Sequence, residues 1–443
     1  MLARFAAAVG EHPDRPAVID SLGTTTFAGL ADEVARWRAR YRAAGVPPGA
    51  VIAIEGDYST PTIGAFLAST IENQLVVPLS PDSAVHAEAF RGIAQAEWRV
   101  AADQGTVTRT GTAADHAHFL ELRRRGSPGL VLFSSGTTGA HKAAVHDLAK
   151  LLTKFEQPRP ARRTLVFLQL DHIGGINTLL YALANGGTVV VPPSRAPEDV
   201  AAAIERHRVE LLPTSPTFLN LLMLSGAVER RDLSSVQLVT YGTEPMPAST
   251  LTRAARALPA AAFQQTYGLT EIGILRSKSR DSGSLWVRVG GEGFETKVVD
   301  GRLWVRAESA MLGYLNAPSP FDADGYLDTG DRVEQDGEWL RILGRESEIV
   351  NVGGNKVSPA EVETLILELD GVADAVVSGE PHPITGSAVT ATVVLTRPEP
   401  LSEFKVRLRT YCAARLPPFK VPARVRVVEG PLHSSRYKRR RGL

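Results

Sequence analysis

Short apolar runs alternate with helical stretches between about residues 51 and 270. Several of these runs are rich in β-branched residues, namely 51–54, 130–133, 165–168, 188–191 and 236–239. Strand-like runs that alternate with helices predict βαβ units and mostly parallel sheets. Their near-continuous apolar character is typical of sheets that are covered on both faces. We therefore expect an α/β fold for this region.

After about Arg276 the pattern changes to short runs that are separated by turn signals. Asp300-Gly301 separates the strand-like runs 298–299 and 302–305, and Asp336-Gly337 precedes another run. Asp-Gly between two strand-like runs is a strong hairpin signal. Residues from about 280 to 343 are therefore expected to form an antiparallel sheet or a barrel.

A third region of mixed elements is expected from about residue 345 onward. Ser358, Pro359 and Glu361 would open a helix as N-cap, first-position proline and capping-box glutamate, and Gly371 would end it. Strands are expected over about 373–377 and 389–395.

The last predicted helix runs from about residue 401 to 416. Phe404, Leu408 and Cys412 are spaced four residues apart, so they share one face of this helix. We interpret Cys412 as a buried packing residue, with a reactive thiol as the alternative.

Composition excludes several classes of protein. The chain has 443 residues, which predicts about three domains. Its 49 basic and 48 acidic side chains nearly balance, whereas a nucleic-acid binder needs an excess of positive charge. No apolar run approaches the roughly 20 residues of a membrane span, and no secretory signal is evident. One cysteine excludes an internal disulfide. We expect a soluble cytoplasmic protein without nucleic-acid or membrane partners.

The first candidate site is a polar loop after the run 130–133. Its members are Ser134, Ser135, Gly136, Thr137, Thr138, Gly139 and Lys142. Backbone N–H groups and hydroxyls in such a loop can hold phosphate oxygens, and glycines let the backbone approach closely. The loop lacks the Gly-Lys-Ser/Thr of a Walker motif. A polar surface turn is the alternative.

Two further motifs could complete a nucleotide site. The segment 265–271 ends in Thr270 and Glu271, which could hold a phosphate oxygen and a magnesium ion. The segment 326–331 ends in Asp331, and Arg345 follows fourteen residues later. An aspartate can accept both hydroxyls of a ribose, and an arginine can pair with phosphate. Each motif alone is also compatible with an ordinary strand end or a loop salt bridge.

Together, these motifs resemble those of the adenylate-forming family. They occur in the family's order, with a Gly353-Gly354 loop and a late lysine, and the resemblance covers nearly the whole chain. The family includes acyl-CoA and aryl-CoA ligases, adenylation domains of peptide synthetases, and luciferases. The resemblance implies a large domain over residues 1–345, with two mostly parallel sheets flanked by helices and a small β-barrel part over about 276–345. A small mobile α+β domain would follow over 346–443, with its hinge at Ser347.

The resemblance also implies roles for the matching residues. The loop from Ser134 to Lys142 would close over the β- and γ-phosphates, and Glu271 would bind magnesium. Catalytic groups would be Lys438, His172 and Thr137. The rest of the nucleotide would be bound by Gly242, Thr243, Glu244, Pro245, Thr266, Tyr267, Gly268, Thr270, Asp331 and Arg345. Gly353, Gly354, Asn355 and Lys356 would line a pantetheine tunnel.

The chain departs from the family pattern at several positions. His141 stands where relatives often have proline, Ala143 where they often have glycine, and Asn351 where many have a second lysine. The final motif reads Tyr437-Lys438 instead of Gly-Lys, which allows a one-residue misalignment. The arginines at 439–441 form either a solvated tail or a contact with CoA phosphates or an acidic carrier protein.

The acid substrate is expected to bind near His172. In aryl and acyl ligases, a segment like His172-Ile173-Gly174-Gly175 forms one wall of the acid pocket. Further wall residues would be Tyr241, Gly242, Tyr267, Gly268 and Ile272, with the glycines at 242 and 268 leaving room for a flat ring. Relatives that activate amino acids usually carry an aspartate shortly after the histidine, whereas this chain has Ile176, Asn177 and Thr178. An aromatic or short acyl acid is therefore favoured.

The sequence thus predicts an AMP-forming acid–thiol ligase that uses ATP, Mg²⁺ and, as the favoured acceptor, CoA. A carrier-protein thiol, an amine, or nitrite for diazotisation are alternative acceptors. A nucleotide-binding pseudoenzyme that senses a metabolite, or a phosphotransferase, would be a different class. The retention of Glu271, Asp331 and a late lysine disfavours the pseudoenzyme.

Overall fold

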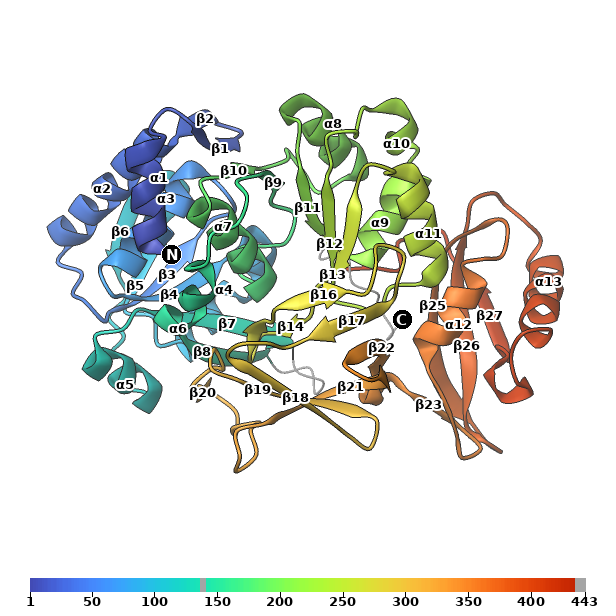
Figure 1. The fold of residues 1–443 in the computed structure, drawn as a ribbon. Coiled ribbons are helices and arrows are strands. Elements are labelled where there is room, and N and C mark those ends of the chain that lie inside the picture. Colours follow the sequence, from blue (N-terminus) through green and yellow to red (C-terminus); the bar gives the residue numbers. More distant parts are fainter. Residues whose placement is uncertain (136–140, 435–443) are drawn as a thin grey trace.

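Two seven-stranded sheets form the body of the large N-terminal part (Figure 1). The computed structural model describes residues 1–135 and 141–434. In the first sheet all neighbouring strands are parallel except the last pair, β1 and β2. Its order is β13 (Ala262–Gln265), β12 (Leu238–Tyr241), β11 (Leu211–Thr214), β9 (Arg163–Leu165), β10 (Thr188–Val190), β1 (Pro16–Asp20) and β2 (Gly23–Thr26).

The second sheet has a parallel centre and antiparallel edges. Its order is β20 (Gly313–Tyr314), β8 (His141–Asp147), β7 (Gly129–Ser135), β4 (Leu75–Leu79), β3 (Val51–Glu55), β5 (Trp98–Ala101) and β6 (Thr106–Arg109). The helices that accompany the two sheets are α1 (Leu2–Glu11), α2 (Phe27–Ala44), α3 (Thr60–Ile71), α4 (Ala87–Ile93), α5 (Ala117–Arg125), α6 (Leu148–Leu152), α7 (Ile173–Ala184), α8 (Pro197–His207), α9 (Pro216–Leu224), α10 (Ala227–Arg230) and α11 (Ala248–Ala257).

The core between the sheets and their helices includes the predicted apolar run 51–54 and also residues of α2 that the sequence analysis did not single out. All of Val51, Ile52 and Ala53 on β3 are fully buried, as expected for a strand that is covered on both faces. On α2, Trp37 and Tyr41 are buried, and the Tyr41 hydroxyl donates to the Ala65 carbonyl at 3.1 Å. Burying a tyrosine in this way requires a partner for its hydroxyl.

A six-stranded antiparallel sheet follows, in the order β16 (Ser277–Ser279), β17 (Trp286–Val289), β22 (Trp339–Arg345), β21 (Leu327–Asp336), β19 (Arg302–Ala307) and β18 (Phe294–Val299). The two-stranded β14 (Gly268–Leu269) and β15 (Gly273–Ile274) precede it. The predicted hairpin at Asp300-Gly301 is confirmed, with φ angles of 51° and 73°. These left-handed values are the ones that a two-residue hairpin loop demands.

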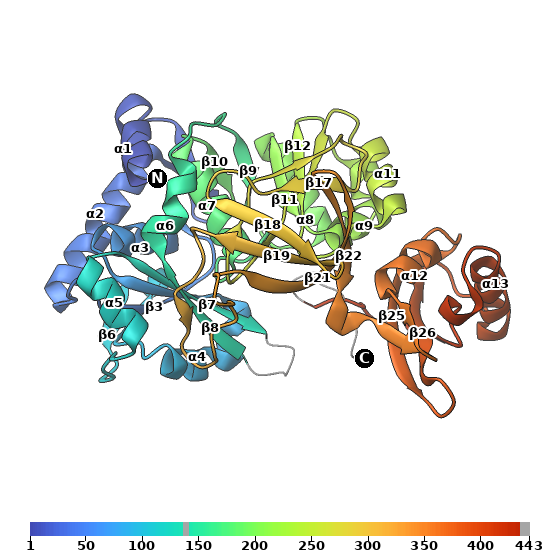
Figure 2. The ribbon, with the colours of Figure 1, turned by 60° about the horizontal axis from the view of Figure 1, so that its bottom comes forward.

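The C-terminal domain is set apart from the two large sheets (Figure 2). Its sheet has the order β24 (Asn355–Val357), β23 (Val350–Val352), β26 (Gly386–Leu395) and β25 (Val372–His382), with β27 (Arg424–Val427) also paired to β26. The helices are α12 (Pro359–Ile366) and α13 (Leu401–Ala413). Phe404, Leu408 and Cys412 are fully buried, and burial raises the pKa of the Cys412 thiol to about 11, which confirms its role in packing.

Ser358 and Pro359 occupy the predicted N-cap and first positions of α12, but two details of the prediction are wrong. The Ser358 side chain makes no capping hydrogen bond, and its hydroxyl donates to the Leu343 carbonyl at 3.1 Å. The helix ends at Ile366, and Gly371, with φ of 83°, lies in the turn before β25. Further upstream, the strand expected over 165–168 already ends at Leu165 in β9.

Candidate functional site

Asp331 is the best-defined group of the candidate nucleotide site. It lies on β21 and is buried, and its Oδ2 accepts from the Tyr267 hydroxyl at 2.6 Å. Asp331 and Arg345 are partners in the register of β21 and β22, which places Arg345 Nε 3.1 Å from Asp331 Oδ1. Burial raises the pKa of Asp331, while Arg345 and the Tyr267 hydroxyl act in the opposite direction. A buried carboxylate with oriented partners can receive ribose hydroxyls.

The predicted adenine segment follows directly from the end of β12. Thr243 has a φ of 74°, which is a strained conformation for a β-branched residue. The carboxylate of Glu244 accepts from the Thr217 backbone N–H at 2.7 Å in the first turn of α9. Thr266, after the next strand β13, donates its backbone N–H to the Tyr241 carbonyl at 2.7 Å. The ends of β12 and β13 thus bring these predicted residues together beside Tyr267.

Glu271 lies on the turn between β14 and β15. Its Oε1 accepts from the Tyr314 hydroxyl at 2.5 Å, and the Lys142 ammonium lies 5.2 Å from the centre of the Tyr314 ring. No cluster of three metal-ligating side chains occurs among the described residues. A single carboxylate fits Mg²⁺ nevertheless, because this ion usually binds one or two carboxylates together with substrate phosphates and water.

The predicted phosphate loop joins two paired strands. Ser134 on β7 is the partner of Lys142 on β8, and Ser135 is the partner of His141. The ring of His141 lies 4.9 Å from both the His86 and the Phe90 rings, so this departure from the family pattern is packed into an aromatic cluster. The predictions for Gly136, Thr137, Thr138 and Gly139, like that for Lys438, lie outside the described residues.

The predicted acid pocket begins where Asp171 precedes α7. This buried carboxylate accepts from the hydroxyls of Ser80 and Ser83, each at 2.6 Å, which ties the start of α7 to the end of β4. The His172 ring follows at once, with Nε2 3.8 Å from Asp171 Oδ1. Asp171 therefore lies beside the histidine, at more than hydrogen-bond distance, and the sequence analysis did not identify this carboxylate as part of the region.

The glycines of the pocket are required by close packing. A Cβ at Gly175 would lie 1.9 Å from the Gln169 carbonyl, and a Cβ at Gly242 would lie 2.7 Å from Thr266 Oγ1. At Gly268 it would lie 2.6 Å from the Gly273 carbonyl. Protein atoms therefore occupy the Cβ side of Gly242 and Gly268, so packing requires both glycines, and their role in leaving room for a ring stays a prediction.

Other predicted wall residues do come together in the fold. Helix α7, which carries Gly174, packs against β15. Strand β15 pairs with β14, so that Gly268 is opposite Ile274. Ile272, in the turn between these strands, is fully buried. Tyr241 and Tyr267 are also buried nearby, at the ends of neighbouring strands β12 and β13.

Lys154 is a residue of this region that the sequence analysis missed. It lies on a 3₁₀ turn, η3 (Thr153–Phe155), and its ammonium donates to Asn177 Oδ1 at 2.6 Å and to the Ile274 carbonyl at 2.7 Å. The available signal was the scarcity of lysine, since Lys142, Lys150 and Lys154 are the only lysines before residue 278. It lies outside every motif, however, so its distant partners could not be found from spacing.

The predicted hinge and tunnel loop lie next to each other. Ser347 is in a 3₁₀ turn, η4 (Glu346–Glu348), between β22 and β23. Gly353 and Gly354, with φ of 55° and 84°, turn the chain from β23 into β24. Lys356 on β24 pairs with Glu346 at 2.7 Å, and hydrogen bonds from Arg332 and Lys356 lower the pKa of Glu346 to about 2. The role of this loop in a tunnel stays a prediction.

The C-terminal domain also contacts the large domain. Asn220 on α9 donates to the Ala373 carbonyl at 3.0 Å. An open cavity of about 590 Å³ adjoins this contact, and its walls are Leu224, Ala248, Ser249, Thr252 and Arg253 on one side and residues 367–372 and Thr396 on the other.

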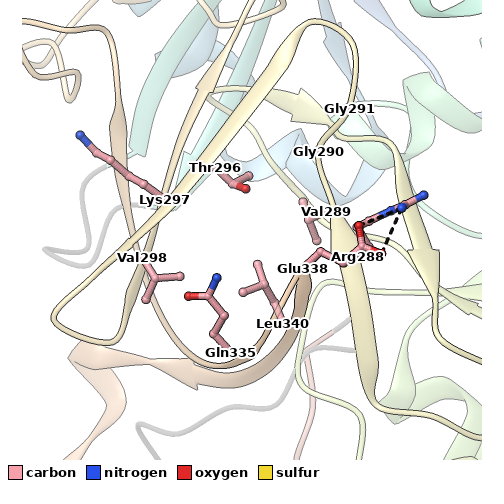
Figure 3. A pocket seen from close by; sticks show the side chains of 10 residues that line it. All are labelled: Arg288, Val289, Gly290, Gly291, Thr296, Lys297, Val298, Gln335, Glu338 and Leu340. Carbon is pink, nitrogen blue, oxygen red and sulfur yellow. Dashed lines mark hydrogen bonds and ion pairs between the residues drawn. The ribbon is translucent and has the colours of Figure 1, made fainter.

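A separate cavity of about 370 Å³ lies in the curl of the six-stranded sheet (Figure 3). Thr296, Gln335 and Leu340 surround it, while Lys297 extends away from its centre. Arg288 at its edge pairs with Glu338 at 3.0 Å. None of the predicted site residues within the described ranges lines this cavity, so it is distinct from the candidate nucleotide and acid sites.

Comparisons with known proteins show the family to which the chain belongs. The family model of AMP-binding enzymes matches residues 5–315, and the model of the C-terminal domain of AMP-binding enzymes matches residues 361–436. A protein of Mycobacterium tuberculosis named 3-[(3aS,4S,7aS)-7a-methyl-1,5-dioxo-octahydro-1H-inden-4-yl]propanoyl:CoA ligase is 32% identical over 318 residues, which are 68% of this chain and 62% of that protein. The chain spans about three fifths of the length of such curated relatives.

Solved structures share the fold over nearly the whole chain. The anthranilate CoA ligase AuaEII, in complex with anthranoyl-AMP, superposes with a TM-score of 0.81 at 20% identity, over 98% of this chain and 95% of that one. The amide bond synthetase McbA from Marinactinospora thermotolerans superposes with a TM-score of 0.78 at 25% identity, over 98% and 96%. The predicted fold class is confirmed. Among the described residues, no helix has both the length and the apolar character needed to cross a bilayer.

Proposed function

The chain belongs to the AMP-binding enzyme family, and we propose that it activates a carboxylic acid with ATP and then transfers the acyl group to CoA. The observation that carries the proposal is the buried Asp331 carboxylate between Tyr267 and Arg345, close to the Thr270–Glu271 turn. This set offers a ribose acceptor, a phosphate contact and a metal ligand in one place.

In the first step, a carboxylate oxygen of the acid would attack the α-phosphorus of ATP. The bond between the α-phosphorus and the bridging oxygen to the β-phosphorus breaks, and pyrophosphate leaves with the electron pair. Asp331 would hold the ribose, Thr270 would contact the α-phosphate, and Lys142 would face the phosphates. Glu271 would hold Mg²⁺, which supplies charge neutralisation when it is bound. In the second step, the CoA thiol attacks the acyl carbon, loses its proton, and AMP leaves.

The acid is proposed to be aromatic or short. The name of the mycobacterial relative specifies a propanoyl group on a bicyclic dione, and that of AuaEII an aminobenzoate. His172 beside Asp171 would approach the substrate carboxylate. The absence of an acidic side chain at Ile176, Asn177 and Thr178 supports an acid without an α-amino group.

The test is a product analysis with ATP, Mg²⁺ and a panel of benzoates, short acids, α-amino acids and palmitate. We expect AMP and pyrophosphate, with benzoates or short acids best. Stoichiometric ADP would show a phosphotransferase, and an α-amino acid as the best substrate would overturn the proposed acid class. Nucleotide binding without turnover of any acid would favour a pseudoenzyme.

The acceptor needs a separate assay, because the similarity to an amide bond synthetase supports an amine as a second candidate. The activated acid should be presented with CoA, a carrier protein, simple amines or nitrite in parallel. We expect a thioester with CoA to form fastest. A faster amide product with an amine would replace the proposed second step and leave the first intact.

A further inference from the structure

Lys154 joins helix α7 to strand β15, and both elements adjoin residues of the predicted acid pocket. Its ammonium donates to the side chain of Asn177 on α7 and to the backbone carbonyl of Ile274 on β15, at 2.6 and 2.7 Å. The residue comes from a third segment, the 3₁₀ turn after α6. Its position therefore depends on three segments that are far apart in the sequence.

Both contacts of Lys154 lie beside predicted pocket residues. Asn177 is three residues after Gly174, so the two share a face of α7. Ile274 is the strand partner of Gly268. Helix α6, which precedes the turn that carries Lys154, is packed tightly against β15, because a Cβ at Gly273 would lie 3.1 Å from a Leu151 methyl group. The ammonium therefore lies at the junction of the two walls.

The protein supplies no negative charge to this cation within the described ranges. Its two acceptors are a neutral amide and a backbone carbonyl, and the Phe155 ring centre is 5.4 Å away. The charged group whose field reaches it is another cation, Arg276, which pairs with Glu292 at 3.5 Å. Burial, followed by Arg276, lowers the pKa of Lys154 to about 7.

An ammonium group has three N–H donors. In Lys154, two of these donors bond to protein acceptors. A buried cation without a carboxylate partner is costly, and a neutral side chain could tie α7 to β15 without that cost. This arrangement is expected where a ligand completes the set of acceptors and brings the missing charge.

We propose that Lys154 determines substrate specificity by pairing with a second carboxylate, at the end of the acid remote from the reacting one. The inference rests on the proposed function, and it narrows the substrate class to dicarboxylic acids with an aromatic or short chain. Asn177 would orient the ammonium, and the anion would occupy its third donor. Activation itself remains the reaction already described, at the other carboxylate.

The test compares matched acids in the pyrophosphate-release assay. Benzoate is paired with its 3- and 4-carboxy derivatives, and butyrate with glutarate, and kcat/KM is measured for each. In the unmodified protein we expect the better diacid of a pair to exceed its monoacid. Lys154→Met should lower kcat/KM for that diacid by roughly 10- to 100-fold, the range for a hydrogen bond to a charged group, and change the monoacid by less than about threefold.

Two further variants, a stability measurement and a pH series distinguish loss of the carboxylate contact from a general loss of activity. Lys154→Arg should restore part of the diacid preference, and Lys150→Met, at an exposed lysine on neighbouring α6, should retain all of it. Thermal unfolding of each variant shows whether it is folded, so that a general loss of activity is recognised. The diacid KM should also rise as the pH increases through 7, because Lys154 then loses its charge.

Different results would reject the proposed function and the second carboxylate. If no acid in any pair yields AMP, the proposed function fails. If monoacids are activated as well as diacids, and Lys154→Met lowers both equally or neither, the function stands and the second carboxylate is rejected. The second carboxylate is also rejected if hydroxybenzoates, whose second substituent is neutral, are better substrates than the matching dicarboxylates and if Lys154→Met abolishes this preference.

Discussion

The candidate site has a ribose side, around Asp331, and an acid side, around His172 and Lys154. The charged groups on the two sides differ in whether the protein supplies a charged partner. On the ribose side, each oxygen of the Asp331 carboxylate has a protein partner, the Tyr267 hydroxyl at 2.6 Å and Arg345 Nε at 3.1 Å. On the acid side, the Lys154 cation has only neutral acceptors among the described residues. Asp331 is buried, whereas Lys154 is half-buried.

On the ribose side the protein itself supplies the partners of the charged group, whereas on the acid side a charged partner is missing among the described residues. A carboxylate with oriented partners can receive a neutral ribose without gaining or losing charge. A cation without a carboxylate partner gains most from an anionic ligand, because electrostatic interactions strengthen away from water. The ribose side is therefore complete before binding, whereas the acid side would be completed by its substrate. The predictions below test each half.

The largest effect is expected at Lys438, which belongs to neither side and lies outside the described residues. As a compact cation it would stabilise charge that develops between the carboxylate and the α-phosphate. Lys438→Ala should slow adenylation by roughly 10²–10³-fold, as for loss of one preorganised donor. Pyrophosphate release measures this step. Arg440→Ala is the matched control and should change it little.

The transfer half-reaction separates a catalytic role of Lys438 from a structural one. Acyl transfer from a chemically supplied acyl-adenylate should survive in Lys438→Ala. Normal adenylation by the variant would contradict the assignment of the C-terminal lysine.

The next effect concerns His146, which lies fully buried on β8 beside the backbone of Thr270 and Ser309. Burial lowers its pKa to about 4 from 6.5, so the unfolded chain binds a proton that the folded one excludes. The free energy of unfolding is therefore highest with respect to this group above pH 6.5. It should fall by about 3 kcal/mol as the pH decreases from 6.5 to 4. Denaturant unfolding between pH 4 and 7 measures it, and the slope should be smaller in His146→Gln. An equal slope in both proteins would assign the acid sensitivity to other groups.

Asp331→Asn should weaken the ribose side selectively. The amide keeps the shape but loses the charge that binds Arg345, and the KM for ATP should rise roughly 10- to 100-fold. The KM for the acid should stay within about twofold, because Lys154 and His172 are untouched. Steady-state kinetics with each substrate varied gives both values. Glu334→Gln, at an exposed residue of the same strand, should leave them unchanged. Equal changes for ATP and acid would remove the distinction between the two sides.

The smallest effect is expected at Thr243, whose φ of 74° is strained. Thr243→Gly would relieve a left-handed conformation that costs about 1–2 kcal/mol. Part of this gain is offset because glycine loses more conformational entropy on folding. The free energy of unfolding should rise by about 0.5 kcal/mol, and denaturant unfolding measures it. Thr243→Ala keeps the strain and should give no gain. If both variants are equally stable, the strain is not stored at this residue.

The hairpin at Asp300-Gly301 and the buried face of α13 were predictable because their causes are local. An Asp-Gly pair adopts left-handed angles easily, and a period of four residues places Phe404, Leu408 and Cys412 on one helix face. Ser358 shows the limit of local reasoning. It occupies the predicted N-cap position, but its hydroxyl donates to the Leu343 carbonyl on β22 and accepts no capping bond from α12. The Leu343 contact joins two elements that no single sequence window contains.

The sequence by itself determined the alternation of strands and helices, the family, and the residues Asp331, Arg345 and Glu271, because each belongs to a motif whose chemistry requires particular side chains in order. Only the tertiary structure showed that Asp331 has Tyr267 and Arg345 as partners and that Lys154 joins α7 to β15. It also showed that protein atoms occupy the Cβ side of Gly242 and Gly268. The physical reason is that the burial and the partners of a charge are set by segments that meet only after folding. Lys154 and Ile274 are 120 residues apart, and no spacing rule connects them.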